Sequence, residues 1–208
     1  MGPRCVEKLL GMFAFAIWDK RAQRLTLARD RIGKKPLVYA QYERGFVFAS
    51  EMRCLFAWPG LSREIDPAAI DEFLSLQYIP APKTIYRAVR KLPPGHVLVY
   101  EKGQATVSPY WDLPLGRVPV TSDIEEAKTL IGDKLRDAVK LRLISEVPLG
   151  AFLSGGIDSS IIVALMSELS PTPVKTFSIG FEEAKFSELP FAREIAQRLG
   201  RVASEMLC

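Results

Sequence analysis

The sequence predicts two units, an antiparallel α+β unit followed by a parallel α/β unit. From residue 11 to residue 107, short apolar strands alternate with tight polar turns, which is typical of antiparallel sheets. From residue 147 to residue 179, two apolar strands without polar alternation flank a helix, which is typical of a parallel sheet covered on both faces. The formal charge also divides the chain, with net +7 over residues 1–111 and net −3 over residues 112–208.

Three hairpins and one helix are expected in the first unit. The hairpin strands are residues 12–18 with 25–29, 36–40 with 46–50, and 97–100 with 105–110. A helix is expected after Asp66, because Pro67 is favoured at the first helical position. Its apolar residues at helical spacing are Ile70, Phe73, Leu74 and Tyr78, and Pro80 and Pro82 end it.

The turn after the second expected strand carries Arg29, Asp30 and Arg31. These charged side chains are expected to form a network of hydrogen bonds between strand and turn. A role at an interface between the two units is the alternative.

A linker and a second set of elements follow. Residues 112–121 contain two prolines and one glycine, which indicates a linker between a domain over 1–111 and a domain over 122–208. A helix is expected from Ser122, because Glu125 follows at the spacing of a capping box. Its expected buried stripe is Ile124, Ala127, Ile131, Leu135, Ala138 and Val139. Next come a strand over 147–153, a helix over 159–169, a strand over 174–179 and a helix over 191–199 that ends at Gly200.

The composition excludes several classes of protein and site. With 48% hydrophobic and 25% charged residues, the chain has globular proportions. The single histidine, His96, rules out an HExxH zinc site and is expected to be a hydrogen-bonded turn residue. The three cysteines lack CxxC spacing, so the cytoplasm is the expected compartment. Cys5 and Cys54 are expected to be small buried residues.

Neither a nucleic acid nor a membrane is expected as a partner. The basic residues are scattered, with no dense run of lysine or arginine. The most apolar stretch, residues 9–18, is much shorter than the roughly 20 residues that a membrane-spanning helix needs.

One segment carries the signature of a binding site, between the strand over 147–153 and the following helix. It reads Ser154-Gly155-Gly156-Ile157-Asp158-Ser159-Ser160. The carboxyl end of a strand that leads into a helix is where open α/β sheets bind ligands. Glycines allow a sharp turn, and the amide groups of the helix start attract an anion such as phosphate. A carboxylate beside phosphates indicates a bound Mg²⁺, so Asp158 is the candidate metal ligand.

Composition alone leaves a second interpretation of this segment open. Neither the GxxxxGK[ST] loop nor the GxGxxG fingerprint is present. The segment is also compatible with an ordinary glycine turn in which Asp158 and Ser159 only cap the helix.

The segment resembles the SGGxDS pyrophosphate loop of the N-type ATP pyrophosphatases. Residues 147–150 and 176–180 on either side resemble the synthetase domain of the glutamine-hydrolysing asparagine synthetases. The first unit resembles the back half of that family's glutaminase domain, in residues 11–16, 29–37, 49–52 and 91–96. The resemblance implies a partial α+β glutaminase-type sandwich followed by a partial α/β parallel-sheet ATP-pyrophosphatase domain.

The resemblance also implies an activity. In this family, the N-terminal domain hydrolyses glutamine, and the ammonia attacks an aspartyl-adenylate that the C-terminal domain makes from ATP and aspartate. The implied enzyme is an ATP-dependent carbon–nitrogen ligase with Mg²⁺ as cofactor, and a homodimer is an assembly that the resemblance allows. By position, the residues implied to hold ATP are Ser154, Gly155, Gly156, Asp158, Ser159 and Ser160 at the pyrophosphate, with Leu153 and Ile179 at the adenosine.

The sequence departs from the family pattern at both ends. The family's glutaminase nucleophile is an amino-terminal cysteine, but the second residue here is Gly2, so no catalytic residue is assigned and no glutamine hydrolysis is expected. Residues 201–208 differ from the usual continuation, and an internal fragment that is inactive alone is expected. The alternatives are a family member that acts on another acceptor, and a non-catalytic nucleotide-binding fragment.

Overall fold

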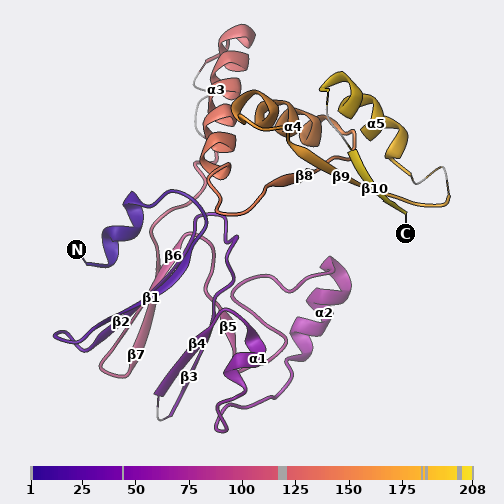
Figure 1. The fold of residues 1–208 in the computed structure, drawn as a ribbon. Coiled ribbons are helices and arrows are strands. Elements are labelled where there is room, and N and C mark those ends of the chain that lie inside the picture. Colours follow the sequence, from indigo (N-terminus) through magenta and orange to yellow (C-terminus); the bar gives the residue numbers. More distant parts are fainter. Residues whose placement is uncertain are drawn as a thin grey trace. The chain divides into compact units, whose positions relative to one another are not determined.

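The chain forms two compact units in a computed structural model that describes residues 2–43, 45–116, 121–183, 185, 187–200 and 203–207. The first unit spans Met1–Arg117 and the second spans Val118–Cys208 (Figure 1). Among the described residues, no helix has both the length and the apolar character that crossing a membrane requires.

Two antiparallel sheets make up most of the first unit. One has the strand order β1-β2-β6-β7 and the other the order β4-β3-β5. The three predicted hairpins are confirmed, because β1 pairs with β2, β3 with β4, and β6 with β7, each antiparallel. The elements are η1 (Pro3–Lys8), β1 (Ala14–Asp19), β2 (Arg24–Arg29), β3 (Val38–Tyr42), β4 (Gly45–Ala49), α1 (Met52–Leu55), α2 (Pro67–Leu76), β5 (Arg90–Lys91), β6 (His96–Glu101) and β7 (Gln104–Pro109).

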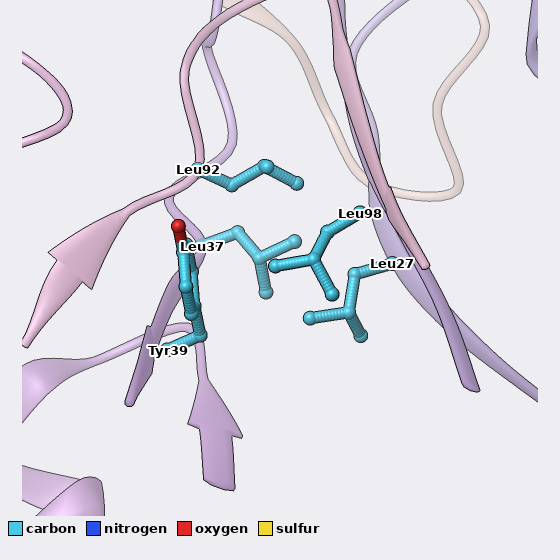
Figure 2. Close-up of a cluster of buried hydrophobic side chains, with 5 residues drawn as sticks. All are labelled: Leu27, Leu37, Tyr39, Leu92 and Leu98. Atoms are coloured by element: carbon cyan, nitrogen blue, oxygen red, sulfur yellow. The ribbon is translucent and has the colours of Figure 1, made fainter. Parts of the chain in front are cut away.

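The two sheets of the first unit share an apolar core. Leu27 of β2 and Leu98 of β6 point toward Leu37, which precedes β3 in the other sheet (Figure 2). Successive side chains of a strand point to opposite faces, so Ala28 lies on the other face of β2, where it packs with Val6 of η1. The central strands β2 and β6 are therefore covered on both sides.

A buried carboxylate organises the turn that follows β2. Asp30 is only 1% exposed, and its carboxylate accepts backbone hydrogen bonds from Ile32, Lys34 and Lys35 at 3.2, 2.9 and 2.9 Å. Burial raises the pKa of the carboxyl group, but the backbone donors outweigh burial and hold the pKa of Asp30 below its ordinary value. The carboxylate is thus an ionised anchor for the turn.

The neighbouring guanidinium group ties the same turn to the second sheet. Arg29 donates to the carbonyl oxygens of Gly33, Lys35 and Leu92 at 2.7, 2.8 and 2.8 Å. Arg31 lies over the ring of Trp111, with its guanidinium carbon 6.0 Å from the ring centroid. The predicted hydrogen-bond network between strand and turn is therefore confirmed for Arg29 and Asp30.

Helix α2 starts where the sequence predicts. The Asp66 side chain accepts from the amide of Ala68 at 3.1 Å, with Pro67 at the first helical position. The helix ends at Leu76, before the prolines, so Tyr78 lies outside it. Its apolar residues stay largely exposed, with 75% exposure at Leu74, and Ala69 is the residue that the helix buries.

The expectation of two buried cysteines is wrong for Cys54. Cys5 is half-buried, but Cys54 is exposed. Helix α1 has four residues and buries Leu55, so the preceding side chain faces away from the core.

The second unit contains a three-stranded parallel sheet with the order β10-β9-β8. Its elements are α3 (Ile124–Arg142), β8 (Gly150–Phe152), α4 (Ile157–Leu169), β9 (Lys175–Gly180), α5 (Leu189–Arg198) and β10 (Ala203–Leu207). The two predicted parallel strands and the helix between them are present. Strand β10 lies within residues 201–208, the segment that differs from the usual family continuation and for which no strand was predicted. Residues 201, 202 and 208 lie outside the described part.

One expectation for α3 is wrong, and another holds only in part. The helix is capped by Asp123, not Ser122, because the Asp123 carboxylate accepts from the amide of Glu126 at 2.8 Å. Of the expected stripe, Val139 is buried, whereas Ile124 and Ile131 are 70% and 60% exposed. Only the C-terminal half of α3 joins the core that it shares with α4.

One face of the parallel sheet is covered by helices. Leu153, at the end of β8, packs with Val163 of α4 and Ala192 of α5. The opposite face carries Phe152 and Phe177, which are paired in register and are 75% and 42% exposed. The expectation of cover on both faces is not met within the described residues.

We expect Asp30→Asn to weaken the first unit and to change its response to pH. The pKa of Asp30 is lowered in the folded chain, so its stabilisation is complete above the unfolded value, near 4, and is lost as the pH falls through the lower folded value. At pH 7 the substitution should lower the free energy of unfolding by about 1–3 kcal/mol. It should also flatten the loss of stability below pH 5. Urea unfolding of the whole chain by tryptophan fluorescence measures this, because Trp18, Trp58 and Trp111 all lie in the first unit.

The matched control is Asp19→Asn in the exposed β1–β2 turn. Backbone donors from Ala22 and Arg21 also lower the pKa of Asp19, but this carboxylate is exposed to solvent. Asp19→Asn should lower the free energy of unfolding by less than Asp30→Asn does. Equal effects at positions 19 and 30 would contradict the role given to the buried network.

Candidate functional site

The candidate loop, residues 154–160, joins the carboxyl end of β8 to the start of α4. The amide of Leu153 donates to the carbonyl of Phe177 at 2.9 Å, so the hydrogen bonding between the strands continues one residue past β8. The Leu153 side chain is 1% exposed within the core beneath the helices. The loop therefore begins from a firmly held strand end.

Gly155 is the position at which the loop requires glycine. Its φ angle is +82°, in the left-handed region that residues with a side chain avoid. A β-carbon there would lie 2.5 Å from Cβ of Phe191 and 2.7 Å from the amide nitrogen of Ala192. The first turn of α5 thus contacts the loop backbone directly, which no local feature of the sequence predicts.

The loop hydroxyl groups hold the loop in shape. The hydroxyl oxygens of Ser154 and Ser159 share a hydrogen bond of 2.9 Å. The Ser159 hydroxyl also accepts from the amide of Ser154 at 3.3 Å, and the Ser160 hydroxyl donates to the carbonyl of Gly156 at 2.7 Å. The serines that the sequence singled out are therefore brought together at one turn.

The start of α4 presents its amide groups without a capping side chain. Gly156 is the N-cap, so Ile157, Asp158 and Ser159 form the first turn of the helix. The first amide groups of a helix have no acceptor within the helix and carry its positive partial charge. Because Asp158 and Ser159 lie inside the helix, the interpretation that they are its caps is not supported.

The loop is open to solvent. Gly156, Ile157 and Asp158 are exposed, and the other loop residues are partly exposed. The described residues contain no group of three or more histidine, cysteine or acidic side chains that could hold a metal alone. A single carboxylate is nevertheless suited to Mg²⁺ that is also held by water and by the phosphates of a ligand, and Asp158 fits that arrangement.

The two residues expected at an adenosine lie on opposite faces of the sheet. The Leu153 side chain points into the core, whereas Ile179, near the end of β9, is 48% exposed. Strand residues alternate between faces, and Leu153 lies beside Ser178, so Leu153 and Ile179 face opposite ways. Leu153 has only its backbone to offer at this edge.

Sequence reasoning missed Ser178. Its side chain is 4% exposed, and its hydroxyl donates to the carbonyl of Leu153 at 2.6 Å, directly before the loop. The sequence shows only that Thr176 and Ser178 alternate with Phe177 and Ile179, which favours the apolar residues as the buried ones; in the structure Thr176, Ser178 and Gly180 are buried between exposed neighbours. Polar residues on the buried face of an apolar strand need hydrogen-bond partners.

Outside the loop, the single histidine behaves as predicted. The Nδ1 atom of His96 donates to the carbonyl of Pro94 at 2.7 Å across the turn before β6. Its role as a hydrogen-bonded turn residue is confirmed.

Two family models match the chain. The model described as a glutamine amidotransferase domain matches residues 1–111, more than half of the chain, and the model described as asparagine synthase matches residues 130–208. The candidate loop lies within the second match.

Curated relatives match along nearly the whole chain. Asparagine synthetase [glutamine-hydrolyzing] 1 of Bacillus subtilis is 40% identical over 195 residues, which cover 93% of this chain and 30% of the relative. A putative asparagine synthetase [glutamine-hydrolyzing] 2 of Methanocaldococcus jannaschii is 37% identical, over 93% of this chain and 38% of the relative. Amidase chry2 of Gibberella zeae is 30% identical, over 94% of this chain and 31% of the relative.

The chain spans 30–38% of the length of these relatives. Both family models and the named synthetases agree with the resemblance seen in the sequence motifs. The chain therefore belongs to the family of glutamine-hydrolysing asparagine synthetases.

Proposed function

We propose that the candidate loop binds the pyrophosphate end of ATP in ATP-dependent asparagine synthesis. The observation that carries the proposal is the geometry at Gly155 and Gly156. A left-handed turn delivers the chain to a solvent-open helix start whose amide groups have no capping side chain. Such a helix start is a ready binding site for phosphate groups.

Each loop residue then has a distinct task. Gly155 and Gly156 let the backbone approach the phosphates, and the amides at the start of α4 donate to the phosphate oxygens. The hydroxyls of Ser154, Ser159 and Ser160, which now bond within the loop, add donors at the same place. Ile179 offers an exposed apolar wall to the adenosine, and Leu153 supports the loop through its backbone.

The proposed reaction follows the family. An aspartate carboxylate oxygen attacks the α-phosphorus of ATP, the bond to the β-phosphate oxygen breaks, and pyrophosphate leaves as the aspartyl-adenylate forms. Ammonia derived from glutamine then displaces AMP to give asparagine. The donors of the loop stabilise the charge that develops on the leaving pyrophosphate. Mg²⁺, when bound, neutralises part of the phosphate charge, and Asp158 is the residue that would hold it.

We assign the remaining parts of the chain in the same way. Residues 1–111 correspond to part of a glutaminase-type sandwich, residues 112–121 to a linker, and residues 122–208 to part of the ATP-pyrophosphatase domain. No residue of the first unit is proposed as a glutaminase nucleophile. The cytoplasm as compartment and a homodimer as assembly remain predictions.

A second candidate function is amide formation on an acceptor other than aspartate. The match to a protein named as an amidase favours keeping it. Pyrophosphate release by the full-length gene product separates the two: release that depends on aspartate is expected for asparagine synthesis. Release that aspartate does not stimulate would favour the other acceptor.

We expect Gly155→Ala to abolish measurable binding of MgATP by the chain. The alanine β-carbon would meet the backbone of α5 at 2.6–2.7 Å, and the φ angle of +82° disfavours any side chain. Isothermal titration calorimetry with MgATP measures the binding. The matched control is Gly132→Ala in α3, where a β-carbon has open space, so stability should rise by about 0.5–1 kcal/mol with MgATP binding unchanged.

We expect Asp158→Ala to weaken MgATP binding at least about tenfold, or about 1.4 kcal/mol. The effect should disappear when ATP is titrated in EDTA without Mg²⁺, because the carboxylate acts through the metal. Asp137→Ala, which removes an exposed carboxylate from α3, is the control and should leave binding unchanged. Absence of MgATP binding by the unsubstituted chain, or equal binding by Asp158→Ala, would refute the assignment of the loop.

A further inference from the structure

We propose that Ser178 is a positioning residue that sets the direction in which the chain leaves β8 and enters the candidate loop. This inference deepens the proposed function and rests on it, because its effect is measured through binding of MgATP. Ser178 lies on β9 and acts on the loop only through the backbone of Leu153.

The hydrogen-bond pattern between β8 and β9 changes at Leu153. The register of the two parallel strands ends at the pair Phe152–Phe177, and the amide of Leu153 still donates to Phe177. In a continuing parallel ladder, the Leu153 carbonyl would next accept from the amide of Ile179. It accepts instead from the Ser178 hydroxyl at 2.6 Å. A side chain has therefore replaced the backbone donor at the last residue before the loop.

The Ser178 hydroxyl approaches the carbonyl from the buried face of the sheet. Ser178 is 4% exposed and lies on the face of β9 that α4 and α5 cover, together with Thr176 and Gly180. A carbonyl drawn toward this face rotates the peptide that links Leu153 to Ser154. The chain then passes the first turn of α5, where a β-carbon at Gly155 would lie 2.5 Å from Cβ of Phe191.

The segment from Leu153 to Gly155 is thus held at both ends. Ser178 fixes the carbonyl at its start, and the backbone of Phe191 limits the space at its end. Without the hydroxyl, the buried Leu153 carbonyl would lose its partner, and the amide of Ile179 is the donor that a continuing ladder would supply. Bonding to that amide would extend the ladder and move Ser154, which shares its hydroxyl bond with Ser159. Loss of the Ser178 hydroxyl should therefore change the geometry of the loop as well as the stability of the unit.

The test compares Ser178→Thr with Ser178→Val in the whole chain of 208 residues. The two side chains have nearly the same shape, and only threonine retains the hydroxyl donor. We expect Ser178→Val to raise the Kd for MgATP about tenfold, or about 1.4 kcal/mol, relative to Ser178→Thr. Ser178→Ala, which removes the hydroxyl without adding volume, should show a similar rise relative to the unsubstituted chain. Isothermal titration calorimetry measures the Kd, and thermal unfolding by circular dichroism is recorded for every variant.

Thr176→Val is the matched control for losing a buried hydroxyl. Thr176 is fully buried on the same face of the same strand, but two residues further from the loop edge. Its substitution should lower the unfolding temperature and leave the Kd for MgATP unchanged within about twofold.

The outcomes separate the two proposals. Failure of the unsubstituted chain to bind MgATP would overturn the proposed function and this inference together. Binding by the unsubstituted chain with equal Kd values for the threonine and valine variants would overturn this inference alone. A Kd that rises in Thr176→Val as much as in Ser178→Ala would also overturn it, because the effect would then follow stability. Where Ser178→Ala does not fold, the threonine and valine pair decides.

Discussion

The feature on which the second unit depends is the end of the hydrogen-bond ladder between β8 and β9. At Leu153, directly after the last paired residues of the ladder, the carbonyl accepts from a buried hydroxyl, and two residues later the chain turns at Gly155 in a left-handed conformation. The helix α5 lies so close to this turn that no side chain fits there. These constraints together place the amide groups of α4 at an open edge of the sheet, where an anion can reach them.

In the first unit, charged side chains hold the turn that follows a strand end. Its turn after β2 is held by the buried carboxylate of Asp30 and by the guanidinium group of Arg29, which reaches the carbonyl of Leu92 near the second sheet. The stability of a turn that is held by ionised groups depends on pH. The candidate loop of the second unit is held instead by glycine geometry and hydroxyl groups. The two units of one family member therefore use different physical means to hold a turn at a strand end.

Each of the two units has an apolar face that stays exposed. Helix α2 leaves Phe73 and Leu74 exposed, and the parallel sheet leaves Phe152 exposed on the face opposite to α4 and α5. The spacing of apolar residues predicted the helix and the strands correctly, because that spacing shows which face of each element is apolar. It did not predict which of these faces are covered among the described residues, because cover depends on other parts of a fold.

The sequence by itself determined the three hairpins and the alternation of strand and helix around residues 154–160, because periodicity and glycine spacing are local properties. It indicated the family through the resemblance of several separate motifs to those of known members. It placed the cap of α3 one residue early. The family resemblance assigned both Leu153 and Ile179 to the adenosine, and that assignment stays a prediction. Only the tertiary structure decided that these two side chains face opposite ways, that Phe191 backs Gly155, and that Ser178 holds the Leu153 carbonyl. Those contacts join residues that are 25 or more positions apart, and chain spacing carries no information about such distances until the strands pair.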